Sequence, residues 1–372
     1  MEYRRLGRTG LDVSAIGLGT EYLNGQTRQA VVSVVHEAIN RGVNYLDLVF
    51  SLPEYLGNLG AALRGHRERV FLTAHLGSTV KDGQYCKTRS VKRSERCFLD
   101  LLARLGTDRV DVLFLHNCNS QKDYQQVIRP GGPLDLARRF RQEGKARFIG
   151  LSGHTISTAT QAVESGQIDV LMFPIHVAGN AVPGKKDLLQ ACAAHDVGLV
   201  AMKPFAGGKL LSKDRTVRVA GYQTGGEALN LKKSSPITPV QCLSYVLAQA
   251  GVSTTVPGCK NLGEMAAALA YWETPEEERD FSALLADFEQ YVAGDCVYCN
   301  HCLPCPSAID VGQTVRLLEM ARQRLTAELR AAYDALPARA SDCIECGACT
   351  ERCPFGVDVI PKLKLAIELF ES

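Results

Sequence analysis

The chain has 372 residues, of which 46% are hydrophobic and 22% are charged, and its formal net charge is +2. This apolar content can build a sizeable core, so the composition excludes a largely disordered chain. The small net charge gives no electrostatic reason to expect nucleic acid or an anionic membrane as a partner. No apolar run reaches the ~18 residues that span a bilayer, and the charged start "MEYRRLGRTG" lacks the apolar core of a secretory signal, so we expect a cytoplasmic protein.

Short apolar runs rich in β-branched residues recur along the first three quarters of the chain, and a helical pattern follows each one. In chain order they are "VSAIGLGT", "VNYLDL", "RVFLTAHLG", "VDVLFLHN", "RFIGLSGH", "DVLMFPIH", "GLVAMKPF" and "STTVPG". Continuous apolar runs are typical of strands buried on both faces. Eight such strand–helix units predict a (β/α)8 TIM barrel, an α/β fold, with an open doubly wound sheet as the alternative.

A long polar segment and then a cysteine-rich region follow the seventh predicted strand, and they indicate where the barrel ends. The segment from Lys209 to Pro239 is long and polar, which is typical of a lid or substrate loop but also of a plain surface insertion. After the eighth unit the composition changes and cysteines accumulate. We therefore predict a barrel domain over residues 1–275 and a smaller domain over residues 276–372.

Eight of the 14 cysteines lie after residue 295, in the runs "CVYCNHCLPCP" and "CIECGACTERCP". Each run has three cysteines at two-residue intervals and a fourth that precedes Pro. Three thiolates on one tight loop suit three irons of one cubane, and the fourth, turned away at the Pro, reaches the other cluster. Structural zinc and disulfides are the alternatives. We predict two [4Fe-4S] clusters, one held by Cys296, Cys299, Cys302 and Cys353, the other by Cys305, Cys343, Cys346 and Cys349.

The 37 residues between the two cysteine runs include "VGQTVRLLEMARQRL" and "TAELRAAYDAL". Both stretches have helical periodicity. The second domain is therefore predicted to be mainly helical and ferredoxin-like. Its clusters would give the protein a capacity for one-electron transfer, unless they serve only to stabilise the fold.

The opening "YRRLGRTGLDVSAIGLGT" resembles that of the aldo/keto reductase family, and "GVNYLDL", "LFLHN", "FIGLSGH", "VAMKPFAGG" and "VSTTVPG" resemble later family landmarks in the same order. With the cysteine-rich end, the chain resembles the branch that carries a C-terminal 4Fe-4S ferredoxin-type domain. The resemblance implies a (β/α)8 oxidoreductase that reduces carbonyl groups with NADPH. It also implies a tetrad of Asp, Tyr, Lys and His, because the alkoxide left by hydride transfer must be protonated.

The tetrad is only partly matched. Asp47 stands at the position of the family's Asp, and His116, in "LFLHN", stands at that of its His. The Lys position is His75, and the Tyr position is Leu52. Tyr55 lies about one helical turn further on and could substitute for the missing phenol if the loop is remodelled; the alternative is a packing role. His75 is either a proton donor suited to neutral pH or a buried, hydrogen-bonded core residue.

The cofactor side of the resemblance is also incomplete. Glu264 occupies the usual Arg position, and Ala267 and Ala268 replace a Glu-Asn pair that grips the adenine in the family. A carboxylate there repels a 2′-phosphate, and Lys260 is the only nearby cation. NAD(P)H binding is therefore doubtful on the sequence alone, and any preference should lean away from NADPH.

Other cofactor-side positions are kept. Ser152 matches a residue that helps hold the nicotinamide amide, and Gly258 allows a close backbone approach to a phosphate. Lys203, in "MKPF", matches a family position at the barrel mouth. It is a candidate for binding an anionic group or for a structural ion pair.

The sequence thus predicts an iron–sulfur oxidoreductase whose barrel site is coupled to two clusters and acts on a small carbonyl-type substrate. Its catalytic candidates are Asp47, His75, His116 and Tyr55. One alternative is an electron carrier with a redox partner protein, in which the barrel no longer binds NADPH. Another is a non-redox acid/base enzyme at the same pocket.

Overall fold

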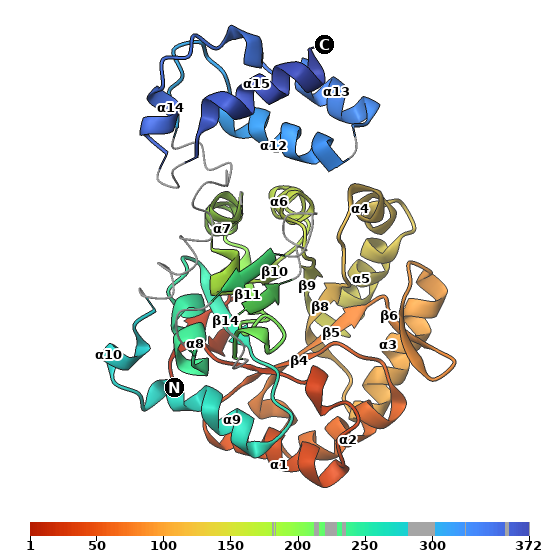
Figure 1. Cartoon of the computed structure of the whole chain (residues 1–372). Helices are drawn as coiled ribbons and strands as arrows, with labels where there is room; N and C mark the ends of the chain where they lie inside the picture. The colour runs from red at the N-terminus through yellow and green to blue at the C-terminus, as the bar shows by residue number, and fades with distance from the viewer. Residues whose placement is uncertain are drawn as a thin grey trace.

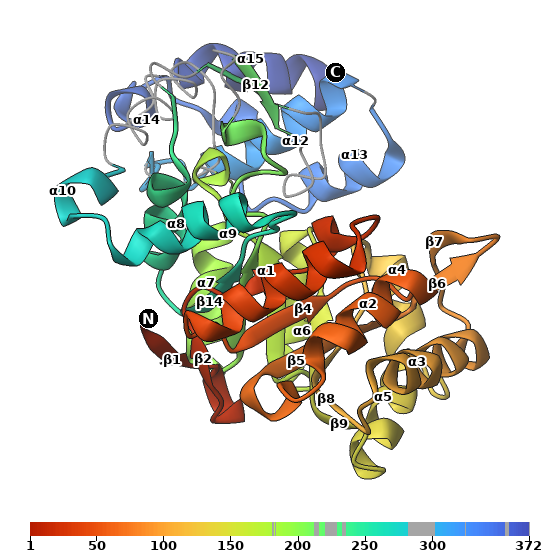
Figure 2. The same cartoon turned by 90° about the horizontal axis from the view of Figure 1, so that it is seen from below.

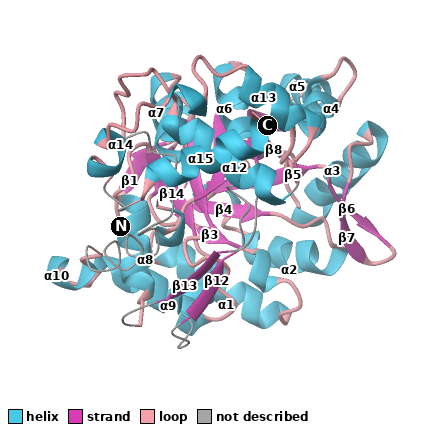
Figure 3. Ribbon diagram, turned by 45° about the horizontal axis from the view of Figure 1, so that its top comes forward, coloured by secondary structure: helices cyan, strands magenta, loops and turns pink. Residues whose placement is uncertain are grey.

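The computed structural model describes residues 1–180, 182, 184–211, 216–219, 229–232, 236–281, 302–323, 325–353 and 357–371. Its core is a sheet of eight parallel strands in the order β14-β11-β10-β9-β8-β5-β4-β3, with helices around them (Figures 1 and 3). The strands are β3 (Leu18–Gly19), β4 (Tyr45–Leu48), β5 (Phe71–Leu76), β8 (Val110–Leu115), β9 (Ala146–Ser152), β10 (Val170–Pro174), β11 (Gly198–Met202) and β14 (Val252–Val256).

Two parallel bridges close this sheet into a barrel, so the open-sheet alternative is wrong. Ile16 pairs with Thr255, and Gly19 pairs with Gly258. A side-chain carbon at Gly19 would lie 2.8 Å from the Val256 carbonyl oxygen, so glycine is needed for this close approach. Every residue of β4, β8 and β10 is buried, as their continuous apolar runs predict.

A hairpin closes the amino-terminal end of the barrel. It is formed by β1 (Tyr3–Arg5) and β2 (Asp12–Ser14), which pair antiparallel. Between and beside these strands, Leu6, Leu11 and Val13 are buried against inward-facing residues of the barrel strands. The opposite, carboxyl-terminal end is therefore the end left for a ligand.

The barrel helices cover the strands with apolar faces. In α3, Phe98, Leu101, Leu102 and Leu105 face the core; Ser90 caps its start and Gly106, in the left-handed region, ends it. The helices are α1 (Arg28–Asn40), α2 (Pro53–Leu63), α3 (Val91–Leu105), α4 (Gln121–Ile128), α5 (Pro133–Gln142), α6 (Ile156–Glu164), α7 (Lys185–Ala194), α8 (Pro239–Leu247) and α9 (Leu262–Leu269). The short α10 (Glu276–Arg279) follows them and buries none of its side chains.

Two strand pairs lie outside the barrel sheet. Strands β6 (Ser78–Lys81) and β7 (Gln84–Lys87) form a hairpin directly after β5, and Figure 2 shows it projecting beside α3. Strands β12 (Thr216–Val219) and β13 (Leu229–Lys232) pair within the long polar segment, the rest of which lies largely outside the described residues.

The C-terminal part is helical and has a core of its own, as the sequence predicts. It contains α12 (Val311–Gln323), α13 (Ala327–Asp334), α14 (Ala348–Glu351) and α15 (Val359–Phe370), drawn in blue in Figure 1. Tyr333 stacks on Phe370 with ring centroids 4.3 Å apart. Residues 282–301, which join this part to the barrel, lie outside the described residues, and the boundary near residue 275 stays a prediction.

Candidate active site

Four polar side chains meet at the carboxyl-terminal end of the barrel. Asp47 lies in β4 and His75 in β5, His116 directly follows β8, and Ser152 ends β9. These strands are parallel neighbours in this order, so their ends bring the four side chains together. All four are buried and line one cavity of about 630 Å³. The cavity is therefore the candidate active site.

A chain of hydrogen-bond contacts joins these residues. His75 Nε2 lies 2.9 Å from Asp47 Oδ1, and His75 Nδ1 lies 3.1 Å from His116 Nδ1. Thr73 Oγ1 donates to the same Asp47 oxygen at 2.6 Å, and Ser152 Oγ lies 3.3 Å from His75 Nδ1. Both ring nitrogens of His75 are thus engaged, and His75 links the carboxylate to the second histidine.

The environment keeps His116 neutral. Burial lowers the pKa of His116 well below its ordinary value, and the neighbouring His75, followed by Arg89, lowers this pKa further. Two adjacent imidazoles also disfavour double protonation. A neutral imidazole donates from one ring nitrogen and accepts at the other, which is what an acid/base relay requires.

Tyr55 does not reach this cavity. It lies in α2, it is 3% exposed, and its hydroxyl is hydrogen-bonded to Thr20 Oγ1. Burial raises the pKa of the Tyr55 phenol strongly. Leu52, at the position of the family's Tyr, immediately precedes α2. The structure therefore brings together Asp47, His75 and His116 but leaves Tyr55 in the hydrophobic core.

Lys203 faces the same cavity from the end of β11. Its Nζ lies 3.0 Å from His154 Nε2, and its backbone has a φ of 58°. Burial lowers the pKa of His154 to about 3, so this imidazole is neutral and accepts a hydrogen bond from the lysine. Burial also lowers the pKa of Lys203, and Glu21 opposes this by raising it. The Lys203–His154 pair therefore adds a second polar group to the cavity, besides Asp47, His75 and His116.

The one cation near Gly258 that the sequence offers for a 2′-phosphate lies beside a carboxylate. Lys260 Nζ lies 3.2 Å from Glu264 Oε1, and the Lys260 backbone N–H donates to Glu264 Oε2 at 2.9 Å. The cation that the sequence offers for a phosphate is thus already paired. Gly258 packs against the ring of Tyr22, since a side-chain carbon at Gly258 would lie 2.3 Å from Tyr22 Cδ2. Ser152, which by the family resemblance is expected to hold a nicotinamide amide, lines the cavity.

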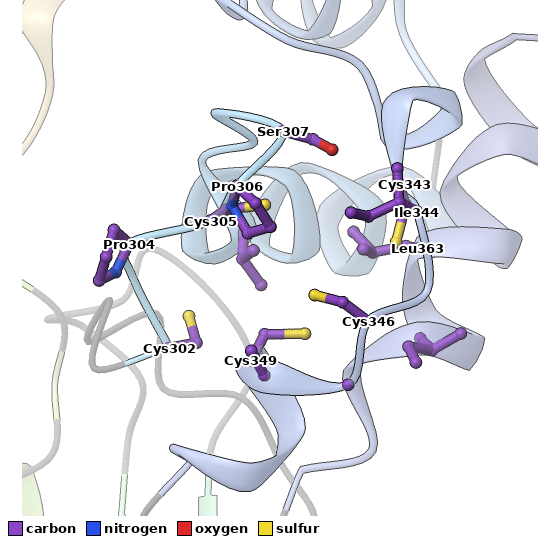
Figure 4. A pocket seen from close by; sticks show the side chains of 14 residues that line it. Cys302, Pro304, Cys305, Pro306, Ser307, Cys343, Ile344, Cys346, Cys349 and Leu363 are labelled. Carbon is purple, nitrogen blue, oxygen red and sulfur yellow. The ribbon is translucent and has the colours of Figure 1, made fainter.

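All but one of the described cysteines of the C-terminal part gather at a second, small cavity. Cys302, Cys305, Cys343, Cys346 and Cys349 line it. Figure 4 shows the sulfurs of Cys305, Cys343, Cys346 and Cys349 around a common space, with Cys302 to one side. Cys296 and Cys299 lie outside the described residues, and Cys353 follows α14.

This donor set suits an iron–sulfur cluster. Within the described part of the chain, no three His, Cys, Asp or Glu side chains converge at the spacing of a single metal ion. A cubane binds its thiolates on separate irons and so holds them further apart than one zinc ion does. Thiolates are the ligands that such clusters take, and the residues present therefore fit the group.

Sequence reasoning missed Tyr85. It lies in β7, and its hydroxyl is 2.6 Å from His116 Nε2. A signal was present: Asp82 and Gly83 form the turn of the β6–β7 hairpin, both with positive φ, and Asp-Gly between strand-forming residues is a strong hairpin pattern. The contact itself joins residues 31 positions apart, which no local pattern shows.

The fold, the cavity and the cysteine-lined space together define a barrel oxidoreductase with an iron–sulfur domain. Comparison with known families matches residues 15–286 to the aldo/keto reductase family and residues 292–357 to a 4Fe-4S dicluster domain. The chain belongs to the aldo/keto reductase family. Among the described residues, no helix is long and apolar enough to cross a membrane.

Relatives agree with this assignment. An uncharacterized oxidoreductase of Bacillus subtilis is 25% identical over 290 residues, covering 71% of this chain and 89% of that protein. L-galactose dehydrogenase of Arabidopsis thaliana is 27% identical over 282 residues, covering 71% and 86%.

Solved structures show the same fold. An aldo-keto reductase from Bacillus halodurans, in its holo form, superposes with a TM-score of 0.62 at 22% identity, covering 78% of this chain and 96% of that chain. A putative aldo-keto reductase from Pseudomonas aeruginosa gives a TM-score of 0.55 at 24% identity, covering 73% and 94%.

Proposed function

We propose that the barrel cavity reduces a small carbonyl compound to its alcohol and that Asp47, His75 and His116 supply the proton. The observation that carries this proposal is the buried Asp47–His75–His116 chain in a cavity of about 630 Å³. Carbonyl reduction needs a hydride at carbon and a proton at oxygen. A dihydronicotinamide, when bound, supplies the hydride, and the residues of this chain supply the proton.

Each residue has a role that follows from its contacts. Asp47 Oδ1 is held by Thr73 and His75, so the carboxyl group is fixed at the cavity wall. His75 connects this carboxyl group to His116, so a proton can pass between the two inside the buried wall of the cavity. The His154–Lys203 pair orients a polar group of the substrate from the opposite side.

We assign Ser152 and Lys203 to the nicotinamide end of the cofactor. Gly258 and Lys260 are assigned to its phosphate end. Because Lys260 is paired with Glu264, the favoured dinucleotide is one without a 2′-phosphate. The same pairing favours a second candidate function: a barrel that binds no dinucleotide and a C-terminal domain that carries electrons to a redox partner. A titration of the cluster-loaded protein with NADH and NADPH, read by fluorescence or calorimetry, separates the two, because the second candidate binds neither.

The C-terminal domain is proposed to hold two [4Fe-4S] clusters, which supply one-electron transfer when bound. The grouping of Cys305, Cys343, Cys346 and Cys349 around one space supports their assignment to one cluster. The remaining ligands, Cys296, Cys299, Cys302 and Cys353, are assigned to the other.

Exchanging Glu264 is expected to change the cofactor preference. Wild type should bind NADPH more weakly than NADH, because the carboxylate repels the 2′-phosphate and neutralises Lys260. Glu264→Arg should raise the affinity for NADPH about 10-fold or more and leave that for NADH within about 3-fold, since one charged hydrogen bond contributes ~1.5–3 kcal/mol. Dissociation constants for both dinucleotides measure this.

Glu264→Gln is the matched control, because it removes the charge and keeps a side chain that can accept from the Lys260 backbone. Its affinity for NADPH should fall between those of wild type and Glu264→Arg. Wild-type binding of NADPH that is as tight as its binding of NADH would contradict the prediction and show that other residues hold the phosphate.

A further inference from the structure

The histidine chain does not end at His116. Tyr85 Oη lies 2.6 Å from His116 Nε2, and the ring of Tyr85 packs edge-on against Phe50 with centroids 5.4 Å apart. The buried residues Asp47, His75 and His116 are each less than 10% exposed, whereas Tyr85 is 37% exposed. The hydrogen-bonded chain therefore runs from the cavity wall to a side chain that meets solvent.

With Asp47 ionised and both imidazoles neutral, the contacts define where the protons lie. A carboxylate only accepts, so His75 Nε2 carries a proton and donates it to Asp47. His75 Nδ1 is then an acceptor, so His116 Nδ1 carries a proton and donates to it. His116 Nε2 is in turn an acceptor, and the Tyr85 hydroxyl donates to it. The two histidines must hold opposite tautomers.

We propose that Tyr85, His116 and His75 form a proton relay that carries protons from solvent to Asp47 in the cavity. The use of the relay in carbonyl reduction rests on the proposed function. The relay itself does not, because its hydrogen bonds are present in the protein without substrate. The β6–β7 hairpin positions Tyr85, the residue of the relay that meets solvent. Tyr85 lies in β7 and pairs with Val80 of β6.

One inward transfer delivers one proton to Asp47, and at each step one N–H or O–H bond breaks as another forms. Water or a buffer acid protonates the Tyr85 oxygen as its own proton passes to His116 Nε2. The His116 Nδ1 proton passes to His75 Nδ1, and the His75 Nε2 proton passes to Asp47. The protonated carboxyl group then gives this proton to the alkoxide formed by hydride transfer. This transfer leaves both histidines in the opposite tautomers. They return to the resting ones between turnovers, when water in the open cavity gives a proton to His75 Nε2, the His75 Nδ1 proton passes to His116 Nδ1, and the His116 Nε2 proton leaves through the Tyr85 oxygen. The hydroxide left in the cavity exchanges with bulk water.

The direction of the resting hydrogen bonds matches reduction. With Asp47 ionised and both imidazoles neutral, every donor in the chain points toward Asp47, so the next proton transfer along it runs into the cavity. Reduction of a carbonyl group consumes a proton in the cavity, as this direction requires. Burial raises the pKa of the Tyr85 phenol, and Asn117 beside it lowers this pKa in part.

The first test needs no substrate. Protein carrying 15N-labelled histidine, with its clusters in place, is compared by NMR as wild type, Tyr85→Phe and Tyr3→Phe; Tyr3 is an exposed tyrosine of the barrel floor. In wild type, we expect His75 protonated at Nε2 and His116 protonated at Nδ1. Two histidines in the same tautomer, or a proton on His116 Nε2, would overturn the relay.

The same spectra measure exchange of the ring N–H groups with water. Phenylalanine keeps the ring that packs on Phe50 but removes the hydroxyl, so exchange at His75 and His116 should slow by roughly 10-fold or more in Tyr85→Phe and stay unchanged in Tyr3→Phe. Unchanged or faster exchange in Tyr85→Phe would show that protons reach the histidines by another route, and the proposal would fail.

The second test uses carbonyl reduction. Tyr85→Phe should reduce the substrate roughly 10-fold or more slowly than wild type in dilute buffer, and added imidazole should restore the rate by donating protons directly. Loss of activity without rescue would mean that Tyr85 acts on the substrate or only holds the fold, against the relay. If wild type reduces no carbonyl compound, the proposed function fails, while the NMR measurements still decide on the relay.

Discussion

Replacement of His75 by glutamine is expected to lower carbonyl reduction by about 10²-fold or more, the usual effect of losing a positioned acid/base group. His75 contacts both Asp47 and His116, at 2.9 and 3.1 Å, and glutamine can keep one hydrogen bond but cannot pass a proton from one ring nitrogen to the other. The value of kcat should fall, with a smaller change in KM, because the proton is needed in the chemical step. Steady-state rates of the cluster-loaded protein measure this.

Two further variants make the result specific. His195→Gln alters an exposed histidine at the end of α7 and should keep wild-type turnover. Tyr55→Phe should also keep turnover while lowering the free energy of unfolding by about 1 kcal/mol, because the lost bond to Thr20 is structural. If Tyr55→Phe abolished turnover and His75→Gln preserved it, the Tyr55 hydroxyl would be the proton donor to the substrate. The site described above would then be wrong.

The protein isolated without oxygen is expected to be brown and to contain about eight irons per chain, as two cubanes require. Cys349→Ser should lose about half of this iron, because Cys349 belongs to the group of thiols around one space. Cys353→Ser should lose the other half, because Cys353 is assigned to the second cluster. Iron and sulfide analysis with absorption spectra measures both.

The control for these variants is Cys97→Ser, a half-buried position on α3 in the barrel, which should keep all of the iron. A colourless protein that contains zinc and retains its eight C-terminal cysteines would contradict the cluster assignment. Loss of all iron in Cys349→Ser with the fold retained would contradict the division into two separate clusters.

The barrel could be predicted because its strands are buried on both faces. The run "VDVLFL" became β8, in which every residue is buried, and the seven other runs gave the other strands. Strand ends also located the site: Asp47, His75 and His116 end neighbouring parallel strands, so their convergence follows from the fold once their positions are known. The pairing of Lys260 with Glu264 is likewise local, since the two residues are four apart.

Tyr55 and Tyr85 show where local patterns stop. Tyr55 lies near Asp47 in the chain, but the phase of α2 turns its ring into the core, where its hydroxyl is hydrogen-bonded to Thr20. Tyr85 lies 31 positions from His116 in the chain, and only the folding of the β6–β7 hairpin brings its hydroxyl to that histidine. Side-chain direction and long-range contact, unlike burial and periodicity, depend on the assembled structure.

The proposed reduction is tested most directly by following deuterium. The cluster-loaded protein is incubated without oxygen with NADH deuterated at the nicotinamide C4 and a panel of small aldehydes and ketones, and the products are analysed by mass spectrometry. We predict one deuterium on the former carbonyl carbon of an alcohol product with wild type, and about 10²-fold slower formation of that product with His75→Gln. An alcohol without deuterium, no alcohol from any member of the panel, or equal rates for the two proteins would contradict the proposed function.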